Sequence, residues 1–75
     1  MEKGSSDWRK LAIAFYALAH QDPRPFKALP PSLQDSQIGQ LCTAYLQSGD
    51  PALLDQAGYL LTGTRQWYVY LGRSL

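Results

Sequence analysis

Hydrophobic residues recur at helical spacing along most of this chain, beginning with the segment 11–19 (LAIAFYALA). Small polar residues that can cap a helix precede Trp8, and no Gly or Pro follows before Pro23. The pattern predicts a first helix from about Asp7 to His20. Apolar residues occupy almost its whole circumference, and its many alanines allow close backbone approach. We therefore expect this helix at the centre of the fold or in an interface between subunits.

A second amphipathic helix is predicted from about Leu33 to Ser48. Ser32 and Asp35 fit the spacing of a capping box, in which side chains satisfy the free N–H groups at a helix start. Gly49 ends the helix, because glycine readily adopts the left-handed conformation that closes one. The buried stripe is expected to consist of Ile38, Leu41, Cys42, Tyr45 and Leu46.

A third, shorter helix is predicted from Pro51 to Thr62. Asp50 can cap its first turn, Pro51 stands where a missing N–H costs little, and Gly63 stops the helix. Its apolar side is expected to consist of Leu53, Leu54, Ala57, Leu60 and Leu61.

The segment 64–72 (TRQWYVYLG) fits either a strand or a short helix. Its aromatic and β-branched residues favour a strand, whereas Thr64 can cap a helix. No other segment alternates with period two, so a strand here would have no partner within the chain. We predict a fourth, short helix with Trp67, Tyr70 and Leu71 facing inward. An extended segment would instead pair with another chain.

Residues 22–31 (DPRPFKALPP) hold four of the five prolines, which block helix continuation and central strand positions. We expect an ordered connector of extended character, fixed to the core by Phe26 and Leu29, with recognition of its prolines by another protein as the alternative. The predicted fold class is all-α, a small three- to four-helix bundle with this connector between the first two helices. One domain covers residues 1–75, with a flexible N-terminus at residues 1–6.

The composition limits the chain to one small core. A chain of 75 residues and 8.4 kDa buries only about 60% of its unfolded surface. A hydrophobic content of 45% with 17% charged residues argues against disorder. The chain also lacks the run of about 18 apolar residues that suggests a transmembrane helix. The first helix lacks the wide basic face of a helix that lies on a membrane, so we predict no membrane partner.

The basic N-terminus and the segment 11–19 could be mistaken for a secretory signal peptide. Glu2 and Asp7 interrupt the basic region, and cleavage after Ala19 would remove the most apolar segment. We therefore expect a cytoplasmic protein.

Few residues suit catalysis, and each has a structural explanation. Cys42 lies on an apolar stripe and is expected to be buried, while His20 stands where a helix dipole favours a cation. Asp35 and Asp50 are expected helix caps and Asp55 a solvated charge, so a carboxylate pair for acid–base chemistry is disfavoured. With one cysteine and no glycine-rich phosphate loop, we predict a non-enzymatic protein without a metal or cofactor.

Charge is distributed unevenly around a net value of +1. Residues 28–64 contain no Lys or Arg and three Asp, giving −3, while residues 1–27 (five basic, three acidic) and 65–75 (two basic) carry +2 each. The third helix would therefore meet DNA phosphates without a basic residue, so helix-turn-helix recognition is disfavoured. A nucleic-acid surface, if present, would consist of Arg9, Lys10, Arg65, Trp67, Tyr68 and Arg73.

These observations favour a small protein-interaction module, an adaptor, accessory or regulatory protein that binds another protein. Nine aromatic residues exceed what one small core encloses, so we expect an exposed patch and a homodimer. A small nucleic-acid-binding regulator is the first alternative, and a small enzyme or ligand carrier is the second. The predicted partner-binding residues, of the types enriched at interface hot spots, are Arg65, Trp67, Tyr68, Tyr70 and Arg73.

Overall fold

The computed structural model describes residues 4–74 and shows helices connected by short turns. In this range, four helices are longer than one turn, two are single turns, and no strand occurs. The all-α prediction is confirmed. The helices are α1 (Ser6–Ala19), α2 (Arg24–Lys27), α3 (Pro31–Gln34), α4 (Gln37–Ser48), α5 (Pro51–Thr62) and α6 (Trp67–Ser74).

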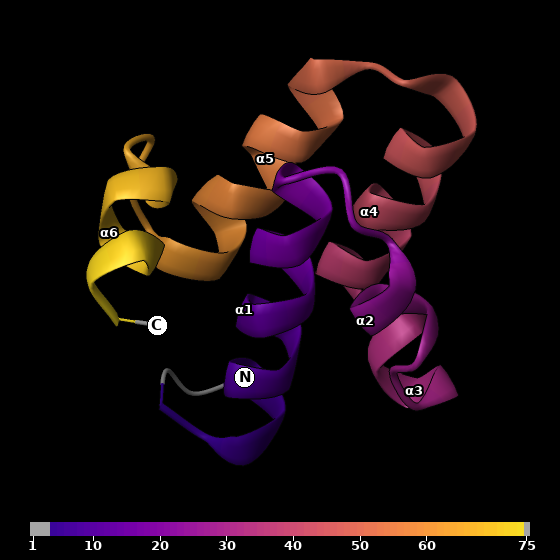
Figure 1. Ribbon diagram of the computed structural model, residues 1–75, viewed down its shortest axis with the longest axis horizontal. Helices are drawn as coiled ribbons and strands as arrows, with labels where there is room; N and C mark the ends of the chain where they lie inside the picture. The colour runs from indigo at the N-terminus through magenta and orange to yellow at the C-terminus, as the bar shows by residue number, and fades with distance from the viewer. Residues whose placement is uncertain (1–3, 75) are drawn as a thin grey trace.

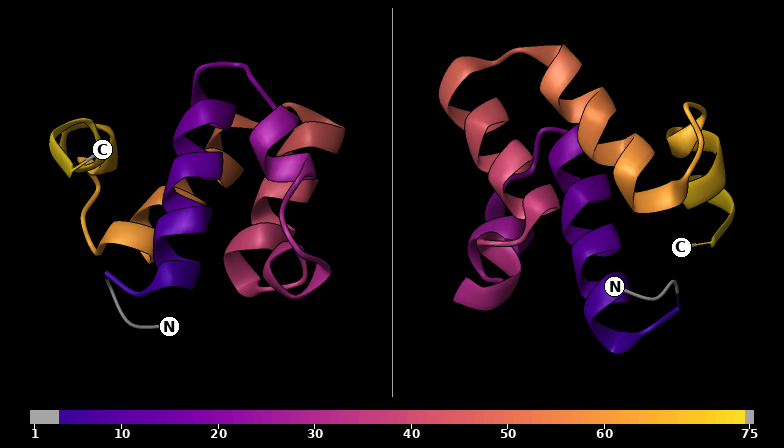
Figure 2. Two further views of the ribbon diagram at one scale, coloured as in Figure 1. Left: turned by 60° about the horizontal axis from the view of Figure 1, so that its bottom comes forward. Right: turned by 180° about the vertical axis from the view of Figure 1, so that it is seen from behind.

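Helix α1 lies in the middle of the molecule, as its apolar circumference predicts. Helix α6 lies to one side of it and the α2–α3 segment to the other, while α4 and α5 form a helical hairpin (Figures 1 and 2). α1 begins at Ser6, a residue that the sequence assigns to a flexible N-terminus. The hydroxyl of Ser5 accepts from the Trp8 N–H and caps the helix. Residues 1–3 of that predicted flexible segment lie outside the described residues.

Helix α1 contributes more buried residues to the core than any other helix. At one end of α1, the Trp8 indole N–H donates to the Leu61 carbonyl of α5 over 2.8 Å. Further along, Phe15 packs edge-to-face against Trp67 of α6, with ring centroids 4.9 Å apart. The side chains of α1 thus join α5 and α6 into one core. Its buried residues are Trp8, Leu11, Ala12, Ala14, Phe15, Leu18, Phe26, Leu33, Cys42, Ala57, Leu61, Trp67 and Leu71.

The proline-rich connector is more helical than expected. Its prolines lie in the first turns of α2 and α3, where no helical N–H is needed, so they start these turns instead of preventing them. Phe26 is buried and Leu29 is half-buried, as predicted. The Gln34 side-chain amide donates to the carbonyls of Phe26, Lys27 and Leu29. The connector is therefore tied both to the core and to itself.

The start of α4 corrects the predicted second helix. The Ser36 hydroxyl, rather than that of Ser32, accepts from the Gly39 N–H over 3.1 Å. The predicted helix is interrupted at Asp35, between α3 and α4. A side chain at Gly39 would collide with the carbonyls of Leu33 and Gln34, so glycine allows the two helices to pack this closely. The predicted stripe is also less buried than expected: Cys42 is buried, Ile38, Leu41 and Tyr45 are half-buried, and Leu46 is exposed.

Helix α5 has the predicted bounds, Pro51–Thr62. Asp50 caps it through the Ala52 N–H at 3.0 Å, and Gly63 closes it at a φ of 79°, in the left-handed region. Its apolar side is narrower than predicted because Leu60 is exposed.

Helix α6 resolves the helix-or-strand ambiguity in favour of a helix. Trp67 and Leu71, one turn apart, are buried as predicted. Tyr70 is 37% exposed, which corrects its predicted inward orientation. The buried face of α6 follows Trp67 and Leu71, and Tyr70 stands at its edge because successive helical residues are rotated by about 100°. Among the helices of residues 4–74, none is long and apolar enough to cross a bilayer.

Candidate functional site

The turn between α5 and α6 fixes the direction in which α6 leaves the hairpin. After Gly63, the Thr64 N–H donates to the Thr62 hydroxyl over 3.3 Å, and the Gln66 N–H donates to the Thr64 hydroxyl over 3.2 Å. Thr62 is itself buried, and its hydroxyl donates to the Gly58 carbonyl over 2.8 Å. Thr64 thus provides a capping bond at the start of α6, as the sequence suggests.

Trp67 anchors α6 against α5. Its indole ring lies directly over Gly58, where any Cβ atom would collide with the ring. The indole N–H donates to the Asp55 carboxylate over 3.2 Å. Asp55 is exposed, as the sequence predicts for a solvated charge, and the hydrogen bond to Trp67 is an additional role that the sequence does not indicate. Trp67 is only 7% exposed, so it supports the surface from beneath.

Around this anchor, the next residues of α6 are exposed. Tyr68, Val69 and Tyr70 are 58%, 40% and 37% exposed. Together with the exposed Arg65 and Arg73 they form what we call the α6 surface, defined as Arg65, Tyr68, Val69, Tyr70 and Arg73. Tyr68 also packs edge-to-face on the Trp67 ring at 5.6 Å, which orients its side chain.

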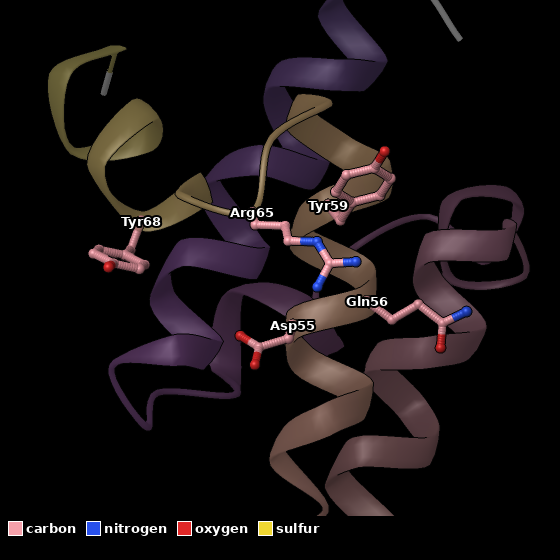
Figure 3. A pocket seen from close by; sticks show the side chains of 5 residues that line it. All are labelled: Asp55, Gln56, Tyr59, Arg65 and Tyr68. Carbon is pink, nitrogen blue, oxygen red and sulfur yellow. The ribbon is translucent and has the colours of Figure 1, made fainter.

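A pocket of about 450 Å³ opens between α5 and α6. We call it the α5–α6 pocket; its lining residues are Asp55, Gln56, Tyr59, Arg65 and Tyr68 (Figure 3). The Arg65 side chain reaches from the turn across α5, and its guanidinium group lies between Tyr59 and Asp55, while Tyr68 stands at the α6 margin (Figure 3). A second, more open hollow borders the other part of α6, lined by Thr64, Gln66, Val69, Tyr70 and Arg73.

The arginines of the α6 surface are not neutralised by neighbouring residues of the described chain. Between residues 4 and 74, the ion pair that forms is Arg24–Asp22, at 2.9 Å and exposed. Arg65 and Arg73 form none with the residues described. Both guanidinium groups therefore remain available to a partner.

Four of the predicted partner-binding residues are exposed, and one is buried. Arg65 and Tyr68 line the α5–α6 pocket, Tyr70 and Arg73 line the second hollow, and Trp67 belongs to the core. Neither hollow includes Arg9 or Lys10, the α1 residues of the alternative nucleic-acid surface.

Sequence reasoning missed the contribution of α5. Asp55, Gln56 and Tyr59 occupy positions i, i+1 and i+4, so Asp55 and Tyr59 share one helix face. That spacing is visible in the sequence, but α6 packing beside this face is a tertiary feature. Tyr59 is 48% exposed and adds an aromatic side chain to the pocket margin.

The other reactive residues lie elsewhere. Burial raises the pKa of the Cys42 thiol from 9.0 to about 12, so it stays protonated at neutral pH. His20 ends α1 at the predicted position and packs on the Tyr16 ring at 4.6 Å. The described residues contain no group of three or more His, Cys, Asp or Glu side chains placed to hold a metal ion.

Comparisons with known proteins add no family. No protein-family model matches the chain, and neither a curated protein nor a solved structure matches it. The functional proposal therefore depends on the surface itself.

Proposed function

We propose that this chain is a small protein-interaction module that binds another protein through the α6 surface. The observation that carries the proposal is the row of exposed apolar and aromatic side chains from Tyr68 to Tyr70, flanked by two arginines without an ion-pair partner among the described residues. Tyrosine and arginine are enriched at interface hot spots, where apolar burial and directional hydrogen bonds combine.

The anchoring of Trp67 supports this role. Binding costs free energy when flexible side chains and loops become ordered. Here the Asp55 hydrogen bond, the close approach at Gly58 and the Phe15 ring hold α6 before any partner arrives. A surface that is already ordered keeps more of its contact energy as affinity.

Nucleic-acid binding is the second candidate. Proteins that bind single-stranded nucleic acids also combine exposed aromatic and basic side chains. The aromatic rings stack on bases and the basic groups contact phosphates, and Tyr68 and Arg65 are such a pair. The −3 charge of residues 28–64 opposes a wider phosphate-binding surface. We therefore rank this function second.

Self-association and a cytoplasmic location complete the proposal. The exposed Tyr68 and Val69 of one chain can pack against the same residues of a second copy, as the excess of aromatic residues suggests. The segment 11–19 supplies Leu11, Phe15 and Leu18 to the core. This supports its interpretation as part of the fold and not as a signal peptide, and with it the proposed cytoplasmic location.

An affinity capture from cell extract, with and without nuclease, tests the proposal. The tagged chain is compared with the triple variant Arg65→Ala, Tyr68→Ala, Arg73→Ala. A matched control replaces two basic residues and one exposed large residue on α1: Arg9→Ala, Lys10→Ala, Ile13→Ala. Circular dichroism and thermal melts check that both variants fold.

The expected result is a protein partner that persists after nuclease, is retained by the control and is lost by the triple variant. The affinity loss should be about 2 kcal/mol or more, since hot-spot residues account for most of the binding energy. Capture that disappears with nuclease supports the nucleic-acid candidate instead. A folded triple variant that captures the same proteins contradicts the proposal.

A further inference from the structure

We propose that a second copy of this chain docks on the α5–α6 pocket about a twofold axis, so that Arg65 of each chain pairs with Asp55 of the other. This inference rests on the self-association in the proposed function and assigns the residues that form the contact. A twofold interface brings the same patch of both subunits together, so each contact between two different residues occurs twice. Such a patch must be complementary to itself.

The two charges of the pocket meet this condition. Arg65 and Asp55 both line the pocket and are exposed, and their opposite charges cancel. Among residues 4–74 the ion pair that forms is Arg24–Asp22, so Arg65 and Asp55 are not paired with each other within the chain. A surface with separate positive and negative groups attracts its own copy when the twofold axis passes between them, because each group then faces the opposite one.

The other side chains of the pocket are self-complementary as well. Gln56 carries an amide, Tyr59 and Tyr68 carry hydroxyls, and each of these groups both donates and accepts hydrogen bonds. The Arg65 side chain stands between the two tyrosines, so an aromatic ring lies on either side of it (Figure 3). Tyr59 and Tyr68 are 48% and 58% exposed. Their burial against a second copy adds the apolar contact that exposed ion pairs alone do not provide.

Asp55 is already positioned for such a pair. Its Oδ1 atom accepts the Trp67 indole N–H over 3.2 Å, and the Trp67 ring lies directly over Gly58. A carboxylate can accept further hydrogen bonds, so Asp55 can bind the guanidinium group of a second copy without releasing Trp67. The contact therefore requires no rearrangement of the packing between α5 and α6.

The opposite side of α6 lacks this complementarity. Of the residues that the structure describes, those lining the second hollow are Thr64, Gln66, Val69, Tyr70 and Arg73, and Arg73 alone among them is charged. A twofold contact centred there would bring two arginines together, and like charges across an interface repel each other. The charges therefore favour a dimer axis on the Tyr68 side of α6.

Charge-swapped variants test the pairing by analytical ultracentrifugation of the full chain at low ionic strength. Arg65→Glu presents a like charge to Asp55 of the second copy, and Asp55→Lys does the same to Arg65. Each variant alone should therefore self-associate about tenfold more weakly than the wild type. An equimolar mixture of the two restores both attractive pairs and should form a heterodimer with a dissociation constant close to that of the wild type.

Arg73→Glu is the matched control, because it changes the net charge by the same amount as Arg65→Glu at a position outside the pocket. It should not weaken self-association. Circular dichroism and thermal melts check that each variant folds. If Asp55→Lys unfolds because Trp67 loses its acceptor, Asp55→Asn keeps an oxygen for the indole N–H and removes the charge. Its mixture with Arg65→Glu should associate more tightly than Arg65→Glu alone.

The salt dependence is an independent readout. Salt screens the attraction between exposed ion pairs, so wild-type association should weaken from about 20 to about 200 mM NaCl. Association that strengthens over this range indicates a contact between like charges, such as the Arg73 side of α6, and contradicts the assignment. A folded mixture that fails to associate, weaker association of Arg73→Glu, or a monomeric wild type at every concentration would also overturn it.

The affinity capture separates this inference from the proposed function. If the charge-swapped mixture does not restore association but the triple variant still loses a captured protein, the pairing alone fails. If the mixture restores association and no other protein is captured, the proposed binding of a different protein fails and the α5–α6 pocket is a contact between copies of this chain.

Discussion

At the scale of single residues, Cys42 shows how burial changes the chemistry of a side chain. The thiol is 1% exposed, and desolvation of the thiolate raises its pKa from 9.0 to about 12. Cysteine nucleophiles and metal ligands act as thiolates. The buried thiol therefore behaves as a small hydrophobic group at neutral pH, as its place on an apolar stripe suggests.

This pKa predicts a specific pH dependence of stability. Above pH 9.0, the Cys42 thiol ionises in the unfolded chain but stays protonated in the folded one, so ionisation stabilises the unfolded state. Relative to Cys42→Ala, the free energy of unfolding of the wild type should therefore fall between pH 9 and 12, by up to about 1.4 kcal/mol per pH unit. Urea unfolding of both proteins at several pH values measures the difference. A difference that does not change above pH 9.0 would show that the thiol is accessible to water.

At the scale of elements, the contact between α5 and α6 depends on the absence of a side chain at Gly58. A Cβ atom there would collide with the Trp67 indole ring, whereas a Cβ atom at Gly72 would lie 3.5 Å from the Tyr16 hydroxyl, an ordinary contact. Both glycines lie within helices and have no positive φ, so backbone conformation does not distinguish them. Steric room does.

Gly58→Ala and Gly72→Ala should therefore have opposite effects. In a helix, alanine is favoured over glycine by up to about 1 kcal/mol, and Gly72→Ala should keep part of this gain. Gly58→Ala should lower the free energy of unfolding by about 1–3 kcal/mol, the usual cost of overpacking. Urea denaturation monitored by tryptophan fluorescence compares the two variants. Equal stabilisation by both would mean that α6 does not pack on Gly58.

The elements also show which signals in the sequence are sufficient. Asp50, Pro51 and Gly63 act within their own turns, so the bounds of α5 follow from the sequence. The choice between Ser32 and Ser36 as a cap depends on how closely α3 approaches α4, which the capping pattern does not encode. The candidate site likewise has one part that the sequence predicts and one part that depends on tertiary packing. Tyr68 and Arg65 belong to a composition typical of interfaces, but the contribution of Tyr59 requires knowing that α6 packs beside α5.

At the scale of the whole molecule, the core leaves several large apolar side chains exposed. They occur on α1, α4, α5 and α6 and are Ile13, Leu46, Tyr59, Leu60, Tyr68, Val69 and Tyr70. Single exposed apolar residues are ordinary, but the consecutive set on α6 is typical of a contact surface. A chain with overall extents of 27 × 24 × 19 Å has little interior space for further aromatic side chains.

We therefore predict a homodimer at high micromolar concentration, formed through the α6 surface. Light scattering should give a mass above that of one 8.4 kDa chain, increasing with concentration as mass action requires. The triple variant of Arg65, Tyr68 and Arg73 should remain monomeric, while the α1 control variant should still associate. A monomeric mass for the wild type across the concentration range would contradict this prediction.

The position of Trp67 couples any binding event to the stability of the whole chain. Its ring packs against Phe15 of α1 and lies over Gly58 of α5. The α6 surface therefore exists only after α1 and α5 have come together, and the unfolded chain does not present it. A partner that binds only the folded state adds RT ln(1 + [L]/Kd) to the free energy of unfolding, about 2.7 kcal/mol at a hundredfold excess over Kd. For a protein of this size, the fraction of chains that is folded and the concentration of the partner are thus linked quantities.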